Sequence, residues 1–265
     1  MNPTRPRTPR LPRPDVHLTR GPGRRAAQRS PHPLIGLGAD DAPVHLTPDD
    51  GHALLTAPAG MGTTELLRTL GVQALAAGRQ VDILDVSGCE HLWAQGREHV
   101  TYLDDPDQLH RHLMGLAHQA RGRSRAGVPG PPRLLLVEND GTTEVLRHHH
   151  ADPRPNGVPL DALTAVLAHG RPVGMQVVLA CRELPPPLRH LRSLFTTRLV
   201  IDPDGPGADS THAPPSSPAG FRPGLWQHIN AAGRRLVQAA RITEQDAARF
   251  IPTRPAARDT KESHR

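Results

Sequence analysis

Lysine is almost absent from this chain: among 265 residues the only one is Lys261, close to the C-terminus. Proteins that hold phosphate groups on a glycine-rich loop commonly place a lysine at the end of that loop. Any such loop in this sequence must therefore lack its lysine, and no nearby lysine of the same chain is an obvious substitute.

Cysteine and long apolar runs are also scarce. Cys89 and Cys181 are far apart and form no metal-binding or redox spacing, which indicates an intracellular chain with reduced thiols. No apolar stretch approaches the roughly 18 residues of a membrane-spanning helix, and residues 1–33 contain no apolar signal core. We expect a soluble, cytoplasmic protein with no intrinsic membrane segment, so that attachment to a membrane would need a partner.

Basic charge is concentrated at the N-terminus. Residues 1–33 contain eight arginines and one acidic residue, Asp15, and contribute +7, whereas the whole chain has a formal net charge of +6 and the remainder sums to −1. Such an arm can bind the phosphate backbone of double-stranded DNA, because each neutralised phosphate releases counterions whatever the base sequence. The same composition is equally typical of a disordered, solvated Arg/Pro-rich tail.

Chain length and the placement of proline favour one domain with tails. A chain of 265 residues can bury a substantial core as one α/β domain or as two small ones. The prolines cluster in short stretches that are typical of tails and loops. We predict a disordered basic tail over residues 1–32, one domain over 33–251 with a loop or locally disordered segment at 203–223, and a C-terminal tail over 252–265.

Hydrophobic periodicity predicts strands that alternate with helices, after a hairpin at 33–38 and 43–47. The other expected strands are 52–56, 80–86, 133–137, 176–180, 197–201 and 234–240, and the expected helices are 65–77, 160–168, 243–250 and one that begins near Pro106. This alternation predicts an α/β fold with a mostly parallel sheet and helices on both faces. Ligands in such folds bind at the carboxyl ends of the strands, where residues 57–64, 138–140 and 181–182 fall.

One loop corresponds to the phosphate-binding pattern Gly-x-x-x-x-Gly-Lys-Ser/Thr. It spans residues 57–64, with the sequence Ala-Pro-Ala-Gly-Met-Gly-Thr-Thr. Ala57 replaces the first glycine, and Gly62 keeps the second. Thr63 replaces the lysine, whereas Thr64 keeps the hydroxyl that would hold Mg²⁺. Half of the pattern is therefore present.

The backbone of this loop could still surround a phosphate. Gly60 and Gly62 allow close approach, and the N–H groups at the start of the following helix favour anions. Against this, Pro58 removes one N–H donor and Ala57 restricts the turn. A glycine-rich turn without any ligand is equally consistent with the loop alone.

A second candidate element follows the apolar run 134–137. When two acidic residues follow such a run, one carboxylate can bind Mg²⁺ and the other can lie beside an attacking water. Here Glu138 takes the metal position and Asn139 takes the water-activating position, where an amide cannot accept a proton. If the alignment with the carboxylate pair is shifted by one residue, Glu138 becomes the base and Val137 stands where the metal ligand should be. One of the two carboxylates is therefore absent in either alignment. Asp140 would compensate only if the strand ended differently.

Five segments in order resemble the motor domain of FtsK/SpoIIIE-type DNA translocases, a group that includes plasmid-transfer ATPases and, more distantly, the ATPases of type VII secretion. The resemblance extends from about Pro33 to Ala240. The matching segments are 34–38 with 43–46, His-Ala-Leu-Leu at 52–55, Glu-Leu-Leu-Arg-Thr-Leu at 65–70, Val-Asp-Ile-Leu-Asp-Val-Ser-Gly at 81–88 and His-Gly-Arg-Pro-Val-Gly-Met-Gln-Val-Val-Leu-Ala-Cys-Arg at 169–182.

The resemblance implies a RecA-like P-loop NTPase fold that uses ATP and Mg²⁺. It assigns phosphate binding to Gly60, Gly62, Thr63 and Thr64. It assigns Mg²⁺ binding to Thr64 and Glu138, and catalysis to Glu138 and Asn139. Four departures from the family are expected at the nucleotide site and not in the apolar frame: Thr63 for Lys, Asn139 for Glu, Ser87 for the Lys of an Asp-Pro-Lys turn, and Cys181-Arg182 for the Thr-Gln that senses the γ-phosphate. We therefore expect a retained fold with its catalytic groups removed, which binds ATP and Mg²⁺ weakly or not at all.

Two functions from different classes follow. The first is a catalytically impaired component of DNA transfer or segregation, in a homo-oligomeric ring or in a hetero-oligomeric ring with a competent FtsK-like paralogue. The second is an active ATP-dependent translocase of double-stranded DNA in which an arginine replaces the lysine, although Arg68 lies about one helical turn beyond the loop. A decayed gene product without selected activity is a third interpretation.

Three remaining candidates have simpler explanations. His148–His150 could bind a metal, but three adjacent histidines on a proline-rich loop lack the ordered surroundings of a metal site. Arg171 could reach the phosphates of a neighbouring subunit, whereas a surface arginine is the simpler interpretation. Cys181 fits a buried small apolar residue better than a nucleophile.

Overall fold

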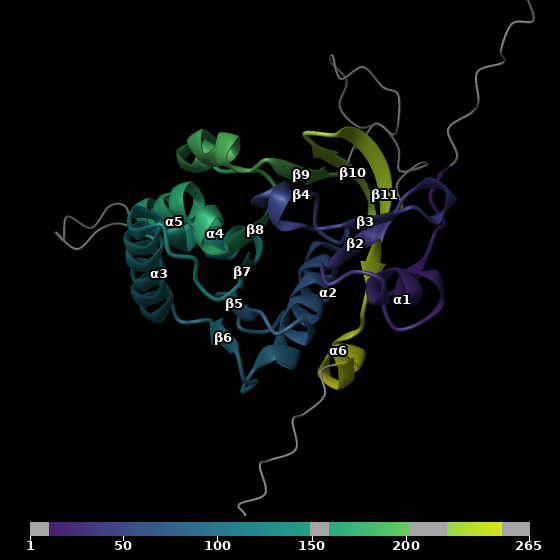
Figure 1. The fold of residues 1–265 in the computed structure, drawn as a ribbon, viewed down its shortest axis with the longest axis horizontal. Helices are drawn as coiled ribbons and strands as arrows, with labels where there is room; N and C mark the ends of the chain where they lie inside the picture. Colours follow the sequence, from purple (N-terminus) through teal and green to yellow (C-terminus); the bar gives the residue numbers. More distant parts are fainter. Residues whose placement is uncertain (1–10, 149–158, 202–221, 251–265) are drawn as a thin grey trace, which may run out of the picture.

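The computed structural model describes residues 11–148, 159–201 and 222–250, and their strands form one eleven-stranded sheet (Figure 1). The strands are β1 (Val16–His17), β2 (Leu34–Leu37), β3 (Pro43–His45), β4 (Ala53–Thr56), β5 (Gln80–Leu84), β6 (Val100–Leu103), β7 (Arg133–Val137), β8 (Met175–Cys181), β9 (Thr197–Val200), β10 (Leu225–Asn230) and β11 (Gly233–Arg241). The helices are α1 (Gly21–Gln28), α2 (Thr63–Ala76), α3 (Pro106–Ala126), α4 (Asn139–His148), α5 (Pro159–His169) and α6 (Glu244–Phe250).

The sheet has a parallel part and an antiparallel part. Its order is β3-β2-β11-β10-β9-β4-β8-β7-β5-β6, with β1 paired to β11 beside this path. The strands from β9 through β4, β8, β7 and β5 to β6 pair in parallel, and those from β9 through β10, β11 and β2 to β3 pair antiparallel. Parallel strands require crossover connections, and these place helices on both faces of the sheet. The predicted α/β fold with a mostly parallel sheet is confirmed.

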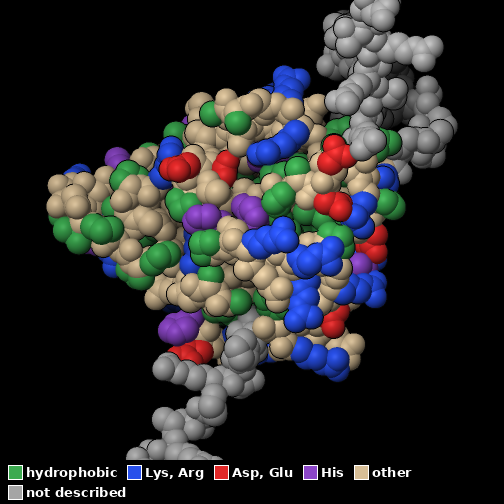
Figure 2. Space-filling model, turned by 45° about the vertical axis from the view of Figure 1, so that its right-hand side comes forward, with side chains coloured by type: hydrophobic (Ala, Val, Ile, Leu, Met, Phe, Trp, Pro, Cys, Tyr) green, Lys and Arg blue, Asp and Glu red, His purple; other side chains and the backbone are tan. Residues whose placement is uncertain are grey.

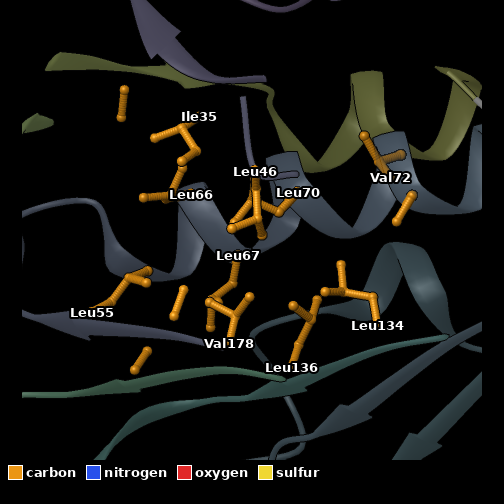
Figure 3. Packing of buried hydrophobic residues seen from close by; sticks show 14 of the residues in the cluster. Ile35, Leu46, Leu55, Leu66, Leu67, Leu70, Val72, Leu134, Leu136 and Val178 are labelled. Carbon is orange, nitrogen blue, oxygen red and sulfur yellow. The ribbon is translucent and has the colours of Figure 1, made fainter. Parts of the chain in front are cut away.

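Strand β7 shows how one continuous apolar run serves two cores. Leu134 and Leu136 belong to the core that contains α2, whereas Leu135 and Val137 belong to the core that contains α3 and α5. Successive side chains of a strand point to opposite faces, so a fully apolar run suits a strand that is covered on both sides. Figure 3 shows the α2 side, where the leucines of that helix lie over Leu134 and Leu136.

The carboxyl ends of three central strands lie within two residues of one another along the sheet. In the parallel register Thr56 of β4 lies opposite Cys181 of β8, and Val137 of β7 lies opposite Leu179 of β8. The segments that follow these strands therefore meet at one edge of the sheet. This edge is the position predicted for a ligand site from the order of the elements.

Most of the expected elements are present within a few residues of their predicted bounds. The hairpin is formed by β2 and β3, which pair antiparallel. Five elements were not predicted: β1, α1, β6, α4 and β10. Helix α4 opens with Asn-Asp-Gly-Thr-Thr, which are weak helix formers, and β10 depends on the partner strand that β11 supplies across a tight turn, with Asn230 opposite Gly233.

Part of the segment expected to be a disordered basic tail is folded. Strand β1 pairs in parallel with the end of β11, with Val16 opposite Ala240, and α1 follows it. Leu18 is fully buried, and Ala26 lies in a small core with Val16. A few apolar residues therefore fold this arginine-rich stretch, because β11 continues past the residues that pair with β10 and β2 and offers further backbone groups.

The remaining expectations for tails and loops concern other residues. Residues 1–10, most of the expected 203–223 loop and the expected C-terminal tail at 252–265 lie outside the described ranges. Those predictions are not tested. Within the described ranges, no helix is both long enough and apolar enough to cross a lipid bilayer.

Candidate functional site

The loop between β4 and α2 has the backbone geometry of an anion-binding turn. Gly60 and Gly62 have φ angles of 80° and 91°, in the left-handed region that favours glycine. Helix α2 begins at Thr63, and no side chain caps its N-terminus. The amides of its first turn have no intrahelical acceptor, so they are available to an anion in front of the loop.

A cavity of about 500 Å³ opens in front of this loop. A Cβ added at Gly60 would meet no atom within 4 Å, so the space before the loop is open. The cavity is lined by Ala57, Pro58, Ala59, Gly60, Gly62, Thr63, Thr64, Glu65, Arg68, Glu90, Glu138, Asn139, Asp140, Ala180, Cys181 and Arg182. The structure therefore brings together the residues that the sequence assigned to phosphate binding, Mg²⁺ binding and catalysis, together with Cys181 and Arg182, but not Ser87.

Thr64 and Glu138 both line the cavity and contact each other. The Thr64 hydroxyl donates a hydrogen bond to Glu138 Oε1 at 2.9 Å, and Glu138 is 1% exposed. A hydroxyl and a carboxylate are oxygen donors of the type that Mg²⁺ prefers. The pair therefore fits a Mg²⁺ ion that would bridge to phosphates held on the loop amides.

His91 is the second partner of Glu138, and sequence reasoning missed it. Its Nε2 lies 2.7 Å from Glu138 Oε2, and Trp93 Nε1 donates to its Nδ1 at 3.4 Å. Because the indole can only donate, Nδ1 is the acceptor and Nε2 carries the proton that reaches Glu138. Both carboxylate oxygens are thus engaged. The only signal in the sequence was a histidine shortly after an expected strand.

Asn139, in the predicted water-activating position, has a structural role. Its Oδ1 accepts hydrogen bonds from the amides of Gly141 at 2.8 Å and Thr142 at 3.3 Å, which satisfies the start of α4. Its φ angle is 55°, and asparagine adopts this left-handed conformation more readily than glutamate does. The departure from glutamate at this position therefore fits the local backbone.

Asp140 does not replace the missing carboxylate. Strand β7 ends at Val137, so Asp140 belongs to the first turn of α4. Its Oδ1 accepts from the amide of Arg182 at 2.8 Å, and its Oδ2 lies 3.4 Å from Arg182 Nε. Asp140 thereby ties the end of β7 to the end of β8.

Ser87 lies in a turn that serves Asp85 and does not line the cavity. The buried Asp85 accepts from the Ser87 amide at 3.1 Å and the Ser87 hydroxyl, from the Glu90 amide at 3.0 Å and from the Tyr102 hydroxyl at 2.8 Å. Burial alone would raise the pKa of Asp85, but these hydrogen bonds outweigh it and hold the pKa below its usual value. The turn therefore has a fixed shape, and it leads the chain to His91.

Arg68 lies at the margin of the cavity and is held away from the loop. Its Nε is 2.6 Å from Glu244 Oε2, a charge contact without the alignment of a hydrogen bond, and its Nη2 donates to the Glu90 carbonyl at 3.1 Å. The poor geometry expected of Arg68 for phosphates agrees with these contacts.

Arg171 and Cys181 occupy different surroundings. Arg171 is exposed, precedes β8 and donates to the Asp49 carbonyl at 3.2 Å, so it lies at the opposite end of that strand from the cavity. Cys181 is buried, and burial, with smaller contributions from Asp140 and Glu183, raises its thiol pKa to about 12. A thiol with that pKa is a poor nucleophile, in agreement with the simpler interpretation.

The histidine run that is disfavoured as a metal site is not described. His149 and His150 lie outside the described residues, and the side chain of His148 is also outside the description. Among the residues that are described, no three His, Cys, Asp or Glu side chains form a metal-binding group.

Comparison with known proteins gives likeness in structure alone. No family model matches the sequence, and no curated protein matches it. The cytoplasmic domain of the type VII secretion ATPase EccC from Thermomonospora curvata is similar with a TM-score of 0.58 and 21% identity, over 92% of this chain and 30% of that one. A structure described as an ATPase has a TM-score of 0.64 and 19% identity, over 88% and 97% of the two chains.

A third similar structure is the monomer form of TcpA, the conjugation coupling protein of pCW3, with ATPγS. Its TM-score is 0.60 at 12% identity, over 83% of this chain and 70% of that one. This chain spans less than a third of the EccC chain. These identities are low enough that the likeness concerns the fold and not the activity. The resemblance to FtsK-type motor domains is thus supported at the level of architecture, and the chain has the fold of the P-loop ATPases found in type VII secretion and conjugation.

Proposed function

We propose that this chain is a subunit on a P-loop ATPase fold that does not hydrolyse ATP at the rate of a motor and serves as a binding or assembly component of DNA transfer or segregation. One observation carries the proposal: Asn139, at the position that would activate water, caps α4 through its side-chain oxygen. An amide has no basic oxygen, so Asn139 cannot accept a proton from water at that position.

The residues that remain are suited to binding. The amides at the start of α2 would hold the phosphates, and Thr64 with Glu138 would hold Mg²⁺. Mg²⁺ would offset the charge of the β- and γ-phosphates. Glu138 keeps both oxygens engaged, by Thr64 and by His91, and the Nδ1 of His91 accepts from Trp93. This buried chain of hydrogen bonds therefore holds Glu138 in the orientation proposed for a metal ligand.

A second candidate is an active translocase of double-stranded DNA with an atypical loop. Two features favour it: the retained Thr64–Glu138 pair and an arginine, Arg182, in the cavity. This function requires that hydrolysis occurs and that duplex DNA stimulates it.

Calorimetry with Mg²⁺ and ATP, with phosphate release measured alongside, separates the two. We expect weak binding, no release above background with or without duplex DNA, and tighter binding by Thr63→Lys, which restores the lysine. Glu138→Gln is the matched control, since it removes the charge at the metal position and keeps the shape. Phosphate release by the natural chain that DNA stimulates and Glu138→Gln abolishes would overturn the proposal.

The proposed partners are DNA and other ATPase subunits. Arg20, Arg24, Arg25 and Arg29 are exposed on and around α1, and no acidic residue lies between positions 16 and 39. Basic side chains gather on the right-hand part of the face in Figure 2. The exposed Arg171 lies at the far end of β8 from the cavity, a place that could face a neighbouring subunit in a homo- or hetero-oligomeric ring.

Salt dependence tests the contact with DNA. Changing these four α1 arginines to glutamine is expected to reduce the slope of log K against log salt concentration by about 3 to 4, since each phosphate contact contributes about 0.9. The control changes the exposed arginines of α3: Arg111, Arg121 and Arg125. Equal effects of the two sets would show that general charge, and not the α1 surface, determines binding.

A further inference from the structure

Four arginines surround the glycine loop, from two sides. Arg68 and Arg182 line the cavity that contains Glu138. Arg222 and Arg241 line a second hollow, of about 440 Å³, which shares Gly60 and Gly62 with the first. Each of the four is a candidate to supply the positive charge that the lysine of such a loop provides.

Three of these arginines are already committed to the fold. Arg68 contacts Glu244 and the Glu90 carbonyl. Arg241 donates from Nε to Asp15 at 2.7 Å. Arg222 lies between two parts of the chain, and its partners are Gln238 Oε1 at 2.8 Å and the carbonyls of Pro12 and Arg13 at 2.9 Å each. Moving any of them to a phosphate would break contacts that hold the N-terminal segment or α6.

Arg182 is held differently. Its side chain is 66% exposed, and its contact is through Nε to Asp140, which is itself 48% exposed. No hydrogen bond of its terminal nitrogens is found within the described residues. Its backbone amide donates to Asp140 Oδ1 at 2.8 Å. The backbone of Arg182 is therefore fixed, whereas the terminal nitrogens of its guanidinium are free to bind a ligand.

The register of the sheet places Arg182 beside the loop. Thr56 at the end of β4 pairs with Cys181 at the end of β8, and the Ala57 amide donates to the Cys181 carbonyl at 3.3 Å. The backbone of Arg182 therefore lies one strand spacing, about 4.8 Å, from the backbone of Ala57, the first residue of the loop. It lines the same cavity as Gly60 and Thr64.

We propose that Arg182 supplies the charge of the absent lysine and binds the terminal phosphate of a nucleotide seated on the loop. The inference rests on the proposed function, in that the loop receives a nucleotide. The cavity is lined by four acidic side chains and two arginines, and Arg68 is neutralised by Glu244. A triphosphate therefore depends on Mg²⁺ and on Arg182, whose planar guanidinium can make two hydrogen bonds to a phosphate.

Calorimetric titration of the full chain with ATPγS and with ADP, both with Mg²⁺, tests the inference. Arg182→Ala is expected to weaken ATPγS binding about tenfold or more, the loss typical of a removed charge-assisted hydrogen bond, and to weaken ADP binding less. The control is Arg189→Ala, an arginine that is 62% exposed, pairs with Glu183 at 3.0 Å and does not line the cavity. It should leave both affinities unchanged.

The double variant Thr63→Lys with Arg182→Ala provides the second measurement. If Arg182 supplies the positive charge that the loop lysine normally provides, lysine at position 63 restores most of the ATPγS affinity that Arg182→Ala removes. Thermal unfolding of each variant separates loss of binding from loss of fold, since Arg182 is exposed and its removal should not lower the Tm.

Three results would overturn the inference: ATPγS binding that is unchanged in Arg182→Ala, failure of lysine at position 63 to compensate, or absence of ATPγS binding by the natural chain. None of these bears on turnover. Phosphate release by the natural chain would instead overturn the proposed function, and the role of Arg182 would still be decided by the affinities.

Discussion

The Nε2 atom of His91 lies 2.7 Å from Oε2 of Glu138, and both side chains are buried. The opposite oxygen of Glu138 accepts from Thr64, and His91 is in turn fixed by the indole of Trp93. The residue proposed to bind Mg²⁺ is therefore part of a closed set of hydrogen bonds. Its members should depend on one another for stability as well as for ligand binding.

Replacement of His91 by phenylalanine should lower the free energy of unfolding by about 2–3 kcal/mol, because a buried carboxylate oxygen loses its donor. The double variant His91→Phe with Glu138→Leu should lose less than the sum of the two single variants. Urea denaturation measures all three. Simple additivity would mean that the two residues do not interact in the folded protein.

Replacement of Asn139 separates its cap from its backbone conformation. Asn139→Gly keeps the left-handed conformation and should cost only a few tenths of a kcal/mol, whereas Asn139→Ala should cost about 1–2 kcal/mol. Asn139→Glu should be destabilised like the alanine variant and should not release phosphate. Denaturation midpoints and a phosphate assay check this, and turnover by Asn139→Glu would show that the site lacks only its base.

Stability should fall in mild acid because two histidines are buried. Burial lowers the pKa of His52 to about 4, more than its hydrogen bond to the Leu167 carbonyl raises it, and burial likewise lowers the pKa of His228 to about 4. In the unfolded chain these two histidines take up protons near pH 6.5, whereas in the folded chain they do so only near pH 4. Their contribution to the free energy of unfolding is therefore complete above pH 6.5 and is lost as the pH falls toward 4.

The contribution of His52 can reach about 3 kcal/mol. The Tm should therefore be level from pH 8 to 7 and should drop below pH 6. In His52→Gln the drop should be shallower even though the variant is less stable at pH 7. A pH profile that is identical in the two proteins would assign the acid sensitivity to other groups.

Leucines at the N-terminus test whether the basic arm is part of the folded unit. Leu18 is fully buried and Leu11 is 57% exposed. Leu18→Ala should cost about 2–5 kcal/mol, as truncation of a buried leucine does, whereas Leu11→Ala should be within about 0.5 kcal/mol of the natural chain. If both variants were as stable as the natural chain, the arm would not be docked in solution.

The sequence by itself determined the architecture of the sheet and the edge at which the candidate site lies. Continuous apolar runs such as 133–137, and strands that alternate with helices, allow few other arrangements, and in a parallel sheet the carboxyl ends must meet. The sequence also determined which groups are absent, because the lysine and one carboxylate are missing whatever the fold.

The tertiary structure alone decided what the remaining side chains contact. His91 reaches Glu138 across 47 positions of sequence, and Arg68 is drawn to Glu244 across 176. Local periodicity carries no information on such pairs, since they depend on how separate strands and helices pack. The same holds for the N-terminal arm, whose composition is that of a disordered chain, yet it folds because β11 offers it a free edge and a place to bury Leu18.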